Sequence, residues 1–130
     1  MSDVYAVDLA LDLRESVPDA VLADLRRHLD PESPEADDAF PMLAARGPAA
    51  RIGGVLFGEL VHRAGGWALT VRQEIHAEFL PEIDALVERL VPHSRTVGVV
   101  GQCRFHEDHA PELLINAAGT LRKTPLRYAE

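Results

Sequence analysis

Cysteine and long apolar runs are nearly absent from the sequence. The single cysteine, Cys103, excludes an intrachain disulfide framework and is typical of a reducing compartment. No apolar run approaches the roughly 20 residues that a membrane span needs. The opening Met1-Ser2-Asp3 also lacks the basic and apolar regions of a signal peptide. We therefore expect a cytoplasmic protein that does not bind membranes.

Basic residues are scarce relative to acidic ones. The chain has 13 Lys and Arg residues against 21 Asp and Glu residues, which gives a formal net charge of -8. This charge opposes binding to nucleic-acid phosphates, and it favours a basic protein as a partner. The preference for Arg over Lys is typical of a high-GC bacterial genome.

The remaining composition is that of one globular domain. A chain of 130 residues with 47% hydrophobic side chains can bury one sizeable core. Apolar periodicity predicts a strand over residues 4–15 and a helix from about Pro18 to His28 or Leu29. The predicted order then continues with an irregular acidic loop at about 30–50, a β-hairpin over 53–77, a helix over 79–90, a strand over 96–105 and a further strand from Leu113 to Ala117.

This order of elements resembles a split β-α-β, or ferredoxin-like, layer. We therefore predict an α+β fold, a ferredoxin-like two-layer sandwich with a mainly antiparallel sheet, two helices on one face and an extra C-terminal strand. Right-handed crossovers would place the third and fourth strands on either side of the first. The other sheet face stays open. Because this topology hosts many functions, it predicts no activity.

Two glycines, Gly65 and Gly66, predict the tight turn of the hairpin, since both tolerate positive φ. With Ala64 opposite Trp67, this register places Glu59 opposite Arg72 on the open face. The alternation within each element predicts the following core positions: Leu9, Leu11, Leu25, Leu69, Val71, Leu86 and Val99.

Charged and polar residues of both signs share the predicted open face. If the strand order is right, they form one cluster of candidate ligand-binding residues: Asp8, Asp12, Arg72, Glu74, His76, Arg104 and His106. One interpretation is a site in which an Asp orients a His that acts as general base, with no nucleophile evident nearby. The other is a solvated face with cross-strand ion pairs such as Glu59 with Arg72.

Apolar side chains interrupt these charges on the same face. Val55, Phe57, Val61 and Val100 would be exposed in a monomer, so we predict that two open faces stack in a homodimer. The rival arrangement is that the terminal segment from Leu113 to Tyr128 folds back and covers them.

Two further segments invite a functional interpretation. His106-Glu107-Asp108-His109 brings imidazoles and carboxylates together, but it lacks the helical spacing or cysteine pair of an established zinc motif, so we predict no metal and no cofactor. The acidic loop is either a solubilising linker or a surface for a basic partner. Its acidic residues are Asp30, Glu32, Glu35, Asp37 and Asp38.

Two functional hypotheses follow. The first is a non-catalytic binding module that acts through a protein partner, for example by neutralising a basic one. The alternative is a small enzyme or ligand-binding protein whose Asp/His/Arg cluster on the open face acts on a small anionic molecule.

Overall fold

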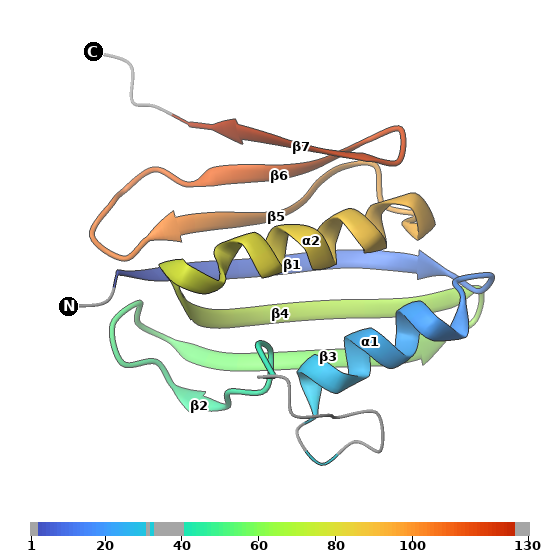
Figure 1. Ribbon diagram of the computed structural model, residues 1–130, viewed down its shortest axis with the longest axis horizontal. Helices are drawn as coiled ribbons and strands as arrows, with labels where there is room; N and C mark the ends of the chain where they lie inside the picture. The colour runs from blue at the N-terminus through green and yellow to red at the C-terminus, as the bar shows by residue number, and fades with distance from the viewer. Residues whose placement is uncertain (1–2, 31, 33–40, 127–130) are drawn as a thin grey trace.

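The computed structural model describes residues 3–30, 32 and 41–126, and a seven-stranded antiparallel sheet is its main element. The strand order is β2-β3-β4-β1-β5-β6-β7. The strands are β1 (Val4–Arg14), β2 (Gly47–Pro48), β3 (Val55–Arg63), β4 (Gly66–His76), β5 (Gly98–Phe105), β6 (Glu112–Ala117) and β7 (Thr120–Pro125). Both α-helices in the described part, α1 (Asp19–Leu29) and α2 (Leu80–Leu90), lie on one side of the sheet (Figure 1).

The predicted ferredoxin-like two-layer sandwich is wrong, because the sheet has seven strands and curls into a half-barrel. The prediction that the third and fourth predicted strands lie on either side of the first is confirmed, since these strands are β4 and β5 and both pair with β1. The difference comes from the C-terminal part, where β6 and β7 extend the sheet beyond β5. Strand twist accumulates with each added strand, which curls the sheet toward α2.

The C-terminal hairpin also answers the rival arrangement for the open face. Rather than folding over the sheet, β6 pairs edge to edge with β5, and β7 pairs with β6. Their turn is Ala118-Gly119, in which both residues have positive φ, at 53° and 86°. The alternative prediction, that the terminal segment covers the open face, is therefore wrong for Leu113 to Leu126. Tyr128 lies outside the described residues.

The central hairpin turns one residue earlier than predicted. Arg63 pairs with Gly66, so the loop is Ala64-Gly65 and each cross-strand partner shifts by two residues. Gly66 is the first residue of β4. A side chain does not fit there, because a Cβ would lie 1.9 Å from the carbonyl oxygen of Leu13 in β1. A shift of two residues preserves which face each side chain occupies. Glu59 therefore stays on the open face but lies opposite Thr70 instead of Arg72.

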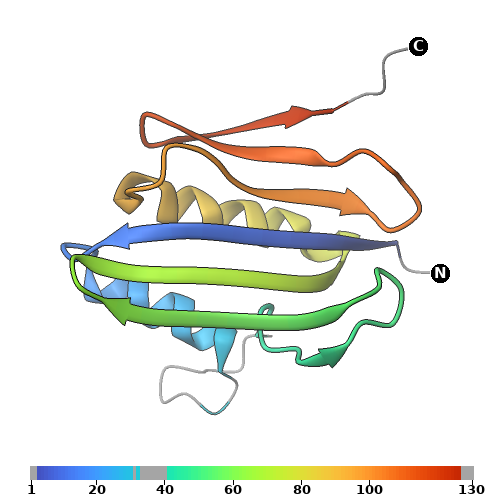
Figure 2. The ribbon, with the colours of Figure 1, turned by 180° about the vertical axis from the view of Figure 1, so that it is seen from behind.

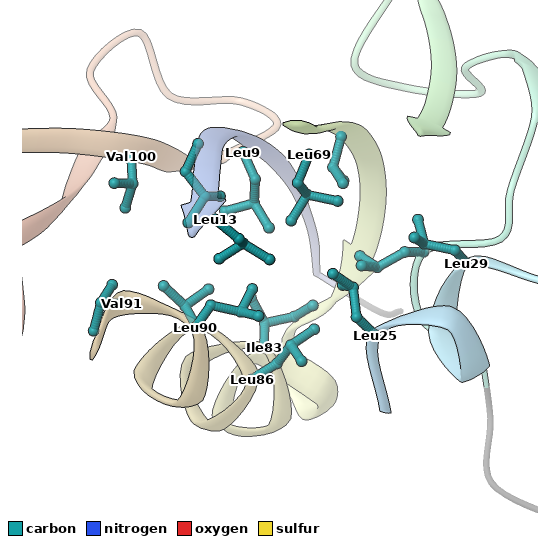
Figure 3. Close-up of a cluster of buried hydrophobic side chains, with 14 of the residues drawn as sticks. Leu9, Leu13, Leu25, Leu29, Leu69, Ile83, Leu86, Leu90, Val91 and Val100 are labelled. Carbon is teal, nitrogen blue, oxygen red and sulfur yellow. The ribbon is translucent and has the colours of Figure 1, made fainter. Parts of the chain in front are cut away.

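The core lies between the sheet and the two helices, as Figure 3 shows. Ile83, Leu86 and Leu90 of α2 point toward β1, while α1 contributes Leu25 and Leu29. All predicted core positions except Val99 are buried. Val99 is 52% exposed, and its neighbour Val100, predicted for the open face, is 1% exposed and lies in the core.

A β-bulge explains this exchange of Val99 and Val100. The pairing of β5 with β6 shifts register between Val99 and Gly101, so the alternation of β5 reverses before that point. Gly101 permits the close approach of β1, because a Cβ there would lie 2.4 Å from the carbonyl oxygen of Asp8. The bulge thus sends Val100 inward and Val99 to the open face.

Part of the predicted irregular loop has defined structure. In residues 41–50, Met42 and Leu43 are buried and Gly47–Pro48 forms the short edge strand β2. The buried Gln73 of β4 holds this segment: its side-chain amide donates to the carbonyl oxygen of Ala45 at 3.0 Å and accepts from the Ala45 N–H at 3.2 Å. Of the acidic residues, Asp30 and Glu32 are described, whereas Glu35, Asp37 and Asp38 lie outside the described residues.

Candidate functional site

The open face of the sheet, seen in Figure 2 without a helix in front of it, carries the predicted cluster of charged residues. At its centre Asp8 lies opposite Arg72 in β4 and opposite Gln102 in β5. The Arg72 guanidinium donates to Asp8 at 3.1 Å, and both side chains are partly buried. Asp8, not Glu59, is therefore the acidic partner of Arg72.

Arg72 also holds the loop that precedes β3. Its second terminal nitrogen donates to the carbonyl oxygens of Gly53, at 3.1 Å, and of Ile52, at 3.4 Å. Gly54 in this loop has positive φ and lies close enough to Arg72 that a Cβ there would be 3.5 Å from Nε. The guanidinium thus forms hydrogen bonds both to Asp8 and to the loop.

Glu74 holds the same loop through its carboxylate. It accepts hydrogen bonds from three successive backbone N–H groups, those of Ala50 at 2.8 Å, Arg51 at 2.6 Å and Ile52 at 3.1 Å. Partial burial alone would raise the pKa of Glu74, but these hydrogen bonds, with the charge of Arg51, lower the pKa below its usual value. Glu74 is therefore a charged anchor for residues 50–52.

The remaining members of the predicted cluster lie toward the two ends of β1. Arg104 donates to main-chain oxygens of the following turn, including that of Asp108 at 2.7 Å. His76 pairs with Val4 in the sheet, and Nδ1 of His106 lies 3.1 Å from the Val4 carbonyl oxygen. Asp12 lies at the other end, where its N–H donates to Thr96 Oγ1 at 2.9 Å.

The structure therefore pairs Asp8 with Arg72, and it joins Arg72 and Glu74 to one loop, residues 50–53. Within residues 3–30 and 41–126, no hydrogen bond or ion pair joins an Asp of the cluster to His76 or His106. The partners of the charged groups are mostly main-chain atoms of loops 50–53 and 105–108. Periodicity in the sequence does not report such partners, so sequence reasoning missed them.

Apolar side chains occupy the rest of the open face. We call the exposed apolar residues Val55, Phe57, Val61 and Val99 the apolar patch. Their exposed fractions are 59%, 40%, 40% and 52%. Between Phe57 and Val99 the surface has a depression of about 330 Å³, whose lining includes Ala10 and Thr70. Small side chains on β1 and β4 thus separate larger apolar ones on β3 and β5.

The bulge in β5 contributes directly to this patch. The sequence predicted Val100 as the β5 member, but the reversed alternation presents Val99 instead. The other three members, Val55, Phe57 and Val61, are on the predicted face and exposed. The one signal in the sequence that could have located the bulge is Gly101, which lies two residues after Val99.

The His106–His109 turn and Cys103 complete the survey of reactive groups. In the part of the chain that the structure describes, no group of three or more His, Cys, Asp or Glu side chains is arranged to hold a metal ion. Cys103 pairs with Val7, and its side chain packs against the core on the helix side of the sheet. Burial, together with the charges of Asp84 and Glu112, raises the pKa of Cys103 to about 11.

Comparisons with known proteins add no functional information. No family model matches the chain, and neither a curated protein nor a solved structure is significantly similar to it. Among the described residues, no helix is long and apolar enough to cross a membrane.

Proposed function

We propose that the protein is a non-catalytic binding module that acts through a protein partner, and that its open sheet face is the docking surface. The observation that carries this proposal is the clustering of exposed apolar side chains. Among the described residues, six large hydrophobic side chains are exposed, and four of them form the apolar patch on this face. Exposed apolar side chains gathered on one face mark interaction surfaces in monomeric soluble proteins.

A second copy of the chain is the partner that the patch fits best. Charges of both signs border its far end, where Asp12, Arg63 and Arg95 line one small depression. A two-fold interface places the same surface on both subunits, so a border of mixed sign can pair with itself. The homodimer would bury Phe57 and Val99 and leave most of the acidic surface exposed. That surface, with a net charge of -8, favours a basic protein as the further partner.

The charged cluster supports this proposal over an anion-binding enzyme. Arg72 and Arg104 would have to bind an anionic substrate, but both donate to carbonyl oxygens that hold neighbouring loops in place. The anion-site alternative predicts that small carboxylates or phosphate raise the melting temperature, and that Arg72→Ala abolishes this effect. The binding-module proposal predicts no such stabilisation.

Sedimentation velocity tests the docking surface. Phe57→Glu places a charge in the patch, where an apolar seam would have to bury it, so we expect the dimer of the wild type to dissociate. Ala20→Glu, an exposed position on α1, adds the same charge on the helix side and should leave the dimer intact. A wild type that stays monomeric at high concentration, or a Phe57→Glu variant that stays dimeric, would contradict the proposal.

A further inference from the structure

An open cleft lies on the helix side of the sheet, opposite to the apolar patch. On the left of Figure 1, the starts of β1 and α2 come together with the ends of β5 and β7. The cleft between them has a volume of about 770 Å³. Small-molecule sites occupy the range of about 300–1,000 Å³. From its lining, we propose that this cleft binds a small molecule that has an apolar or aromatic body and a protonated amine.

The inner wall of the cleft is suited to an apolar body. Tyr5 of β1 and Phe105 of β5 form a tilted aromatic pair with ring centroids 5.4 Å apart. Leu80, the first residue of α2, lies across from them, and Leu126 after β7 adds a side chain that is 44% exposed. Aromatic faces bind both apolar groups and cations. These four residues, from four segments, thus offer contact on several sides.

The polar lining sets the charge of the ligand. Glu112 and Asp108 line the cleft, and Glu112 forms an ion pair with Lys123. Lys123 Nζ lies 2.7 Å from Asp84 Oδ2 but 3.7 Å from Glu112 Oε1. One ammonium is therefore shared by two carboxylates, and it is bound mainly to Asp84. Glu112 keeps most of its negative charge for a ligand.

Apart from His109, which also lines the cleft, the other groups around it agree with this negative sign. The hydrogen bond that Lys123 donates to Asp84 raises the pKa of Lys123 and so keeps its ammonium charged beside Asp84. At the floor of the cleft, burial raises the pKa of the Cys103 thiol, and the Asp84 and Glu112 charges add to the effect. The positive end of the α2 dipole is offset by Glu82 in the first turn. A protonated amine is complementary to this environment, whereas a carboxylate is not.

Spectroscopic titration of the full chain tests the proposal with two matched probes. Phenethylamine and 3-phenylpropionate share a phenyl ring and differ in the sign of their charge. We expect phenethylamine to shift the backbone amide signals of Tyr5, Phe105 and Glu112 in ¹H–¹⁵N spectra, and 3-phenylpropionate to leave them unchanged. Equal shifts with both probes, or none with the amine up to its solubility limit, would overturn the proposal.

A pair of glutamate variants tests the contact that sets the charge. Glu112→Gln should weaken phenethylamine binding about tenfold, the loss expected for one charge-assisted contact. Glu107→Gln, at a nearby side chain that is 73% exposed and does not line the cleft, should leave the affinity unchanged. Equal affinities for the wild type and a folded Glu112→Gln protein would contradict the proposal.

Alkylation of Cys103 gives a second readout that does not depend on the glutamate variants. Because Cys103 lines the cleft and is the single cysteine, its slow alkylation by iodoacetamide at about pH 8, where the amine stays protonated, reports on access to this site. Phenethylamine should slow alkylation, and an unchanged rate at saturating amine would overturn the site. Phe57→Glu, on the other face, should retain amine binding, so this proposal and the docking proposal fail separately.

Discussion

Two regions of the open sheet face contrast in how their side chains are used. Near the start of β1, the charged side chains Arg72, Glu74 and Arg104 bond to main-chain atoms of adjacent loops. Farther along the face, Val61 and Val99 remain exposed, as does Phe57, which lies directly opposite Arg72 at the border of the two regions. The charged region is thus occupied by the protein's own backbone, and the apolar patch is the region left for a partner. A cluster of charges is therefore weaker evidence of a site than uncovered apolar area.

The largest expected effect compares the patch with the core beneath it. Val71 lies on the helix side and is 1% exposed, whereas Val61 of the patch is 40% exposed. Val71→Ala should lower the free energy of unfolding by roughly 1–3 kcal/mol, because it removes buried methyl groups and leaves a cavity. Val61→Ala should lower it by less than about 0.5 kcal/mol in the monomer. Urea denaturation measures both values, and similar losses would mean that the patch is buried.

The next effect tests the charged region. Glu74→Gln removes the charge of a carboxylate that accepts hydrogen bonds from three backbone N–H groups. The free energy of unfolding should therefore fall by about 1–2 kcal/mol. The amides of residues 50–52 should also exchange with solvent faster. Glu59→Gln, on the same face but exposed, is the matched control and should change stability by less than about 0.5 kcal/mol. Unchanged exchange at residues 50–52 would show that Glu74 does not anchor the loop.

The hydrogen bonds of Glu74 should also make the stability depend on pH, with a smaller effect. Because folding lowers the pKa of Glu74 from its usual 4.5, the carboxylate stabilises the folded state above that pH. This contribution is lost as the pH falls below 4.5 and through the lowered pKa. The difference in unfolding free energy between the wild type and Glu74→Gln should therefore shrink on acidification. A difference that grows toward low pH would have the wrong sign for this account.

Periodicity predicted most of the element types and side-chain faces. The helix predicted from Pro18 to Leu29 matches α1 within a residue. Its apolar residues recur at helical spacing, so only a helix places them all on one buried face. The face of each hairpin side chain was predicted correctly although the register was wrong. A register error of two residues leaves each side chain on the same face of the sheet. Register itself depends on the contact of Gly66 with Leu13, which is distant in sequence.

The incorrect predictions share a dependence on partners far along the chain. The β5 bulge is set by β6 and by the close approach of Gly101 to Asp8, so local alternation misplaced Val99 and Val100. The Ala118-Gly119 turn adds β7, so the C-terminal part forms two strands where the sequence indicated one. The bonds of Glu74 to residues 50–52 likewise join segments that periodicity treats separately.

The central claim is that the apolar patch, and not the charged region, is the docking surface of the sheet. The most direct test is a dilution series of ¹H–¹⁵N spectra on the wild-type chain. We predict that dilution shifts the signals of Phe57, Thr70 and Val99 together along one binding curve, while those of residues 50–52 stay constant. Spectra that do not change with concentration, or changes confined to residues 50–52 and 105–108, would contradict the account.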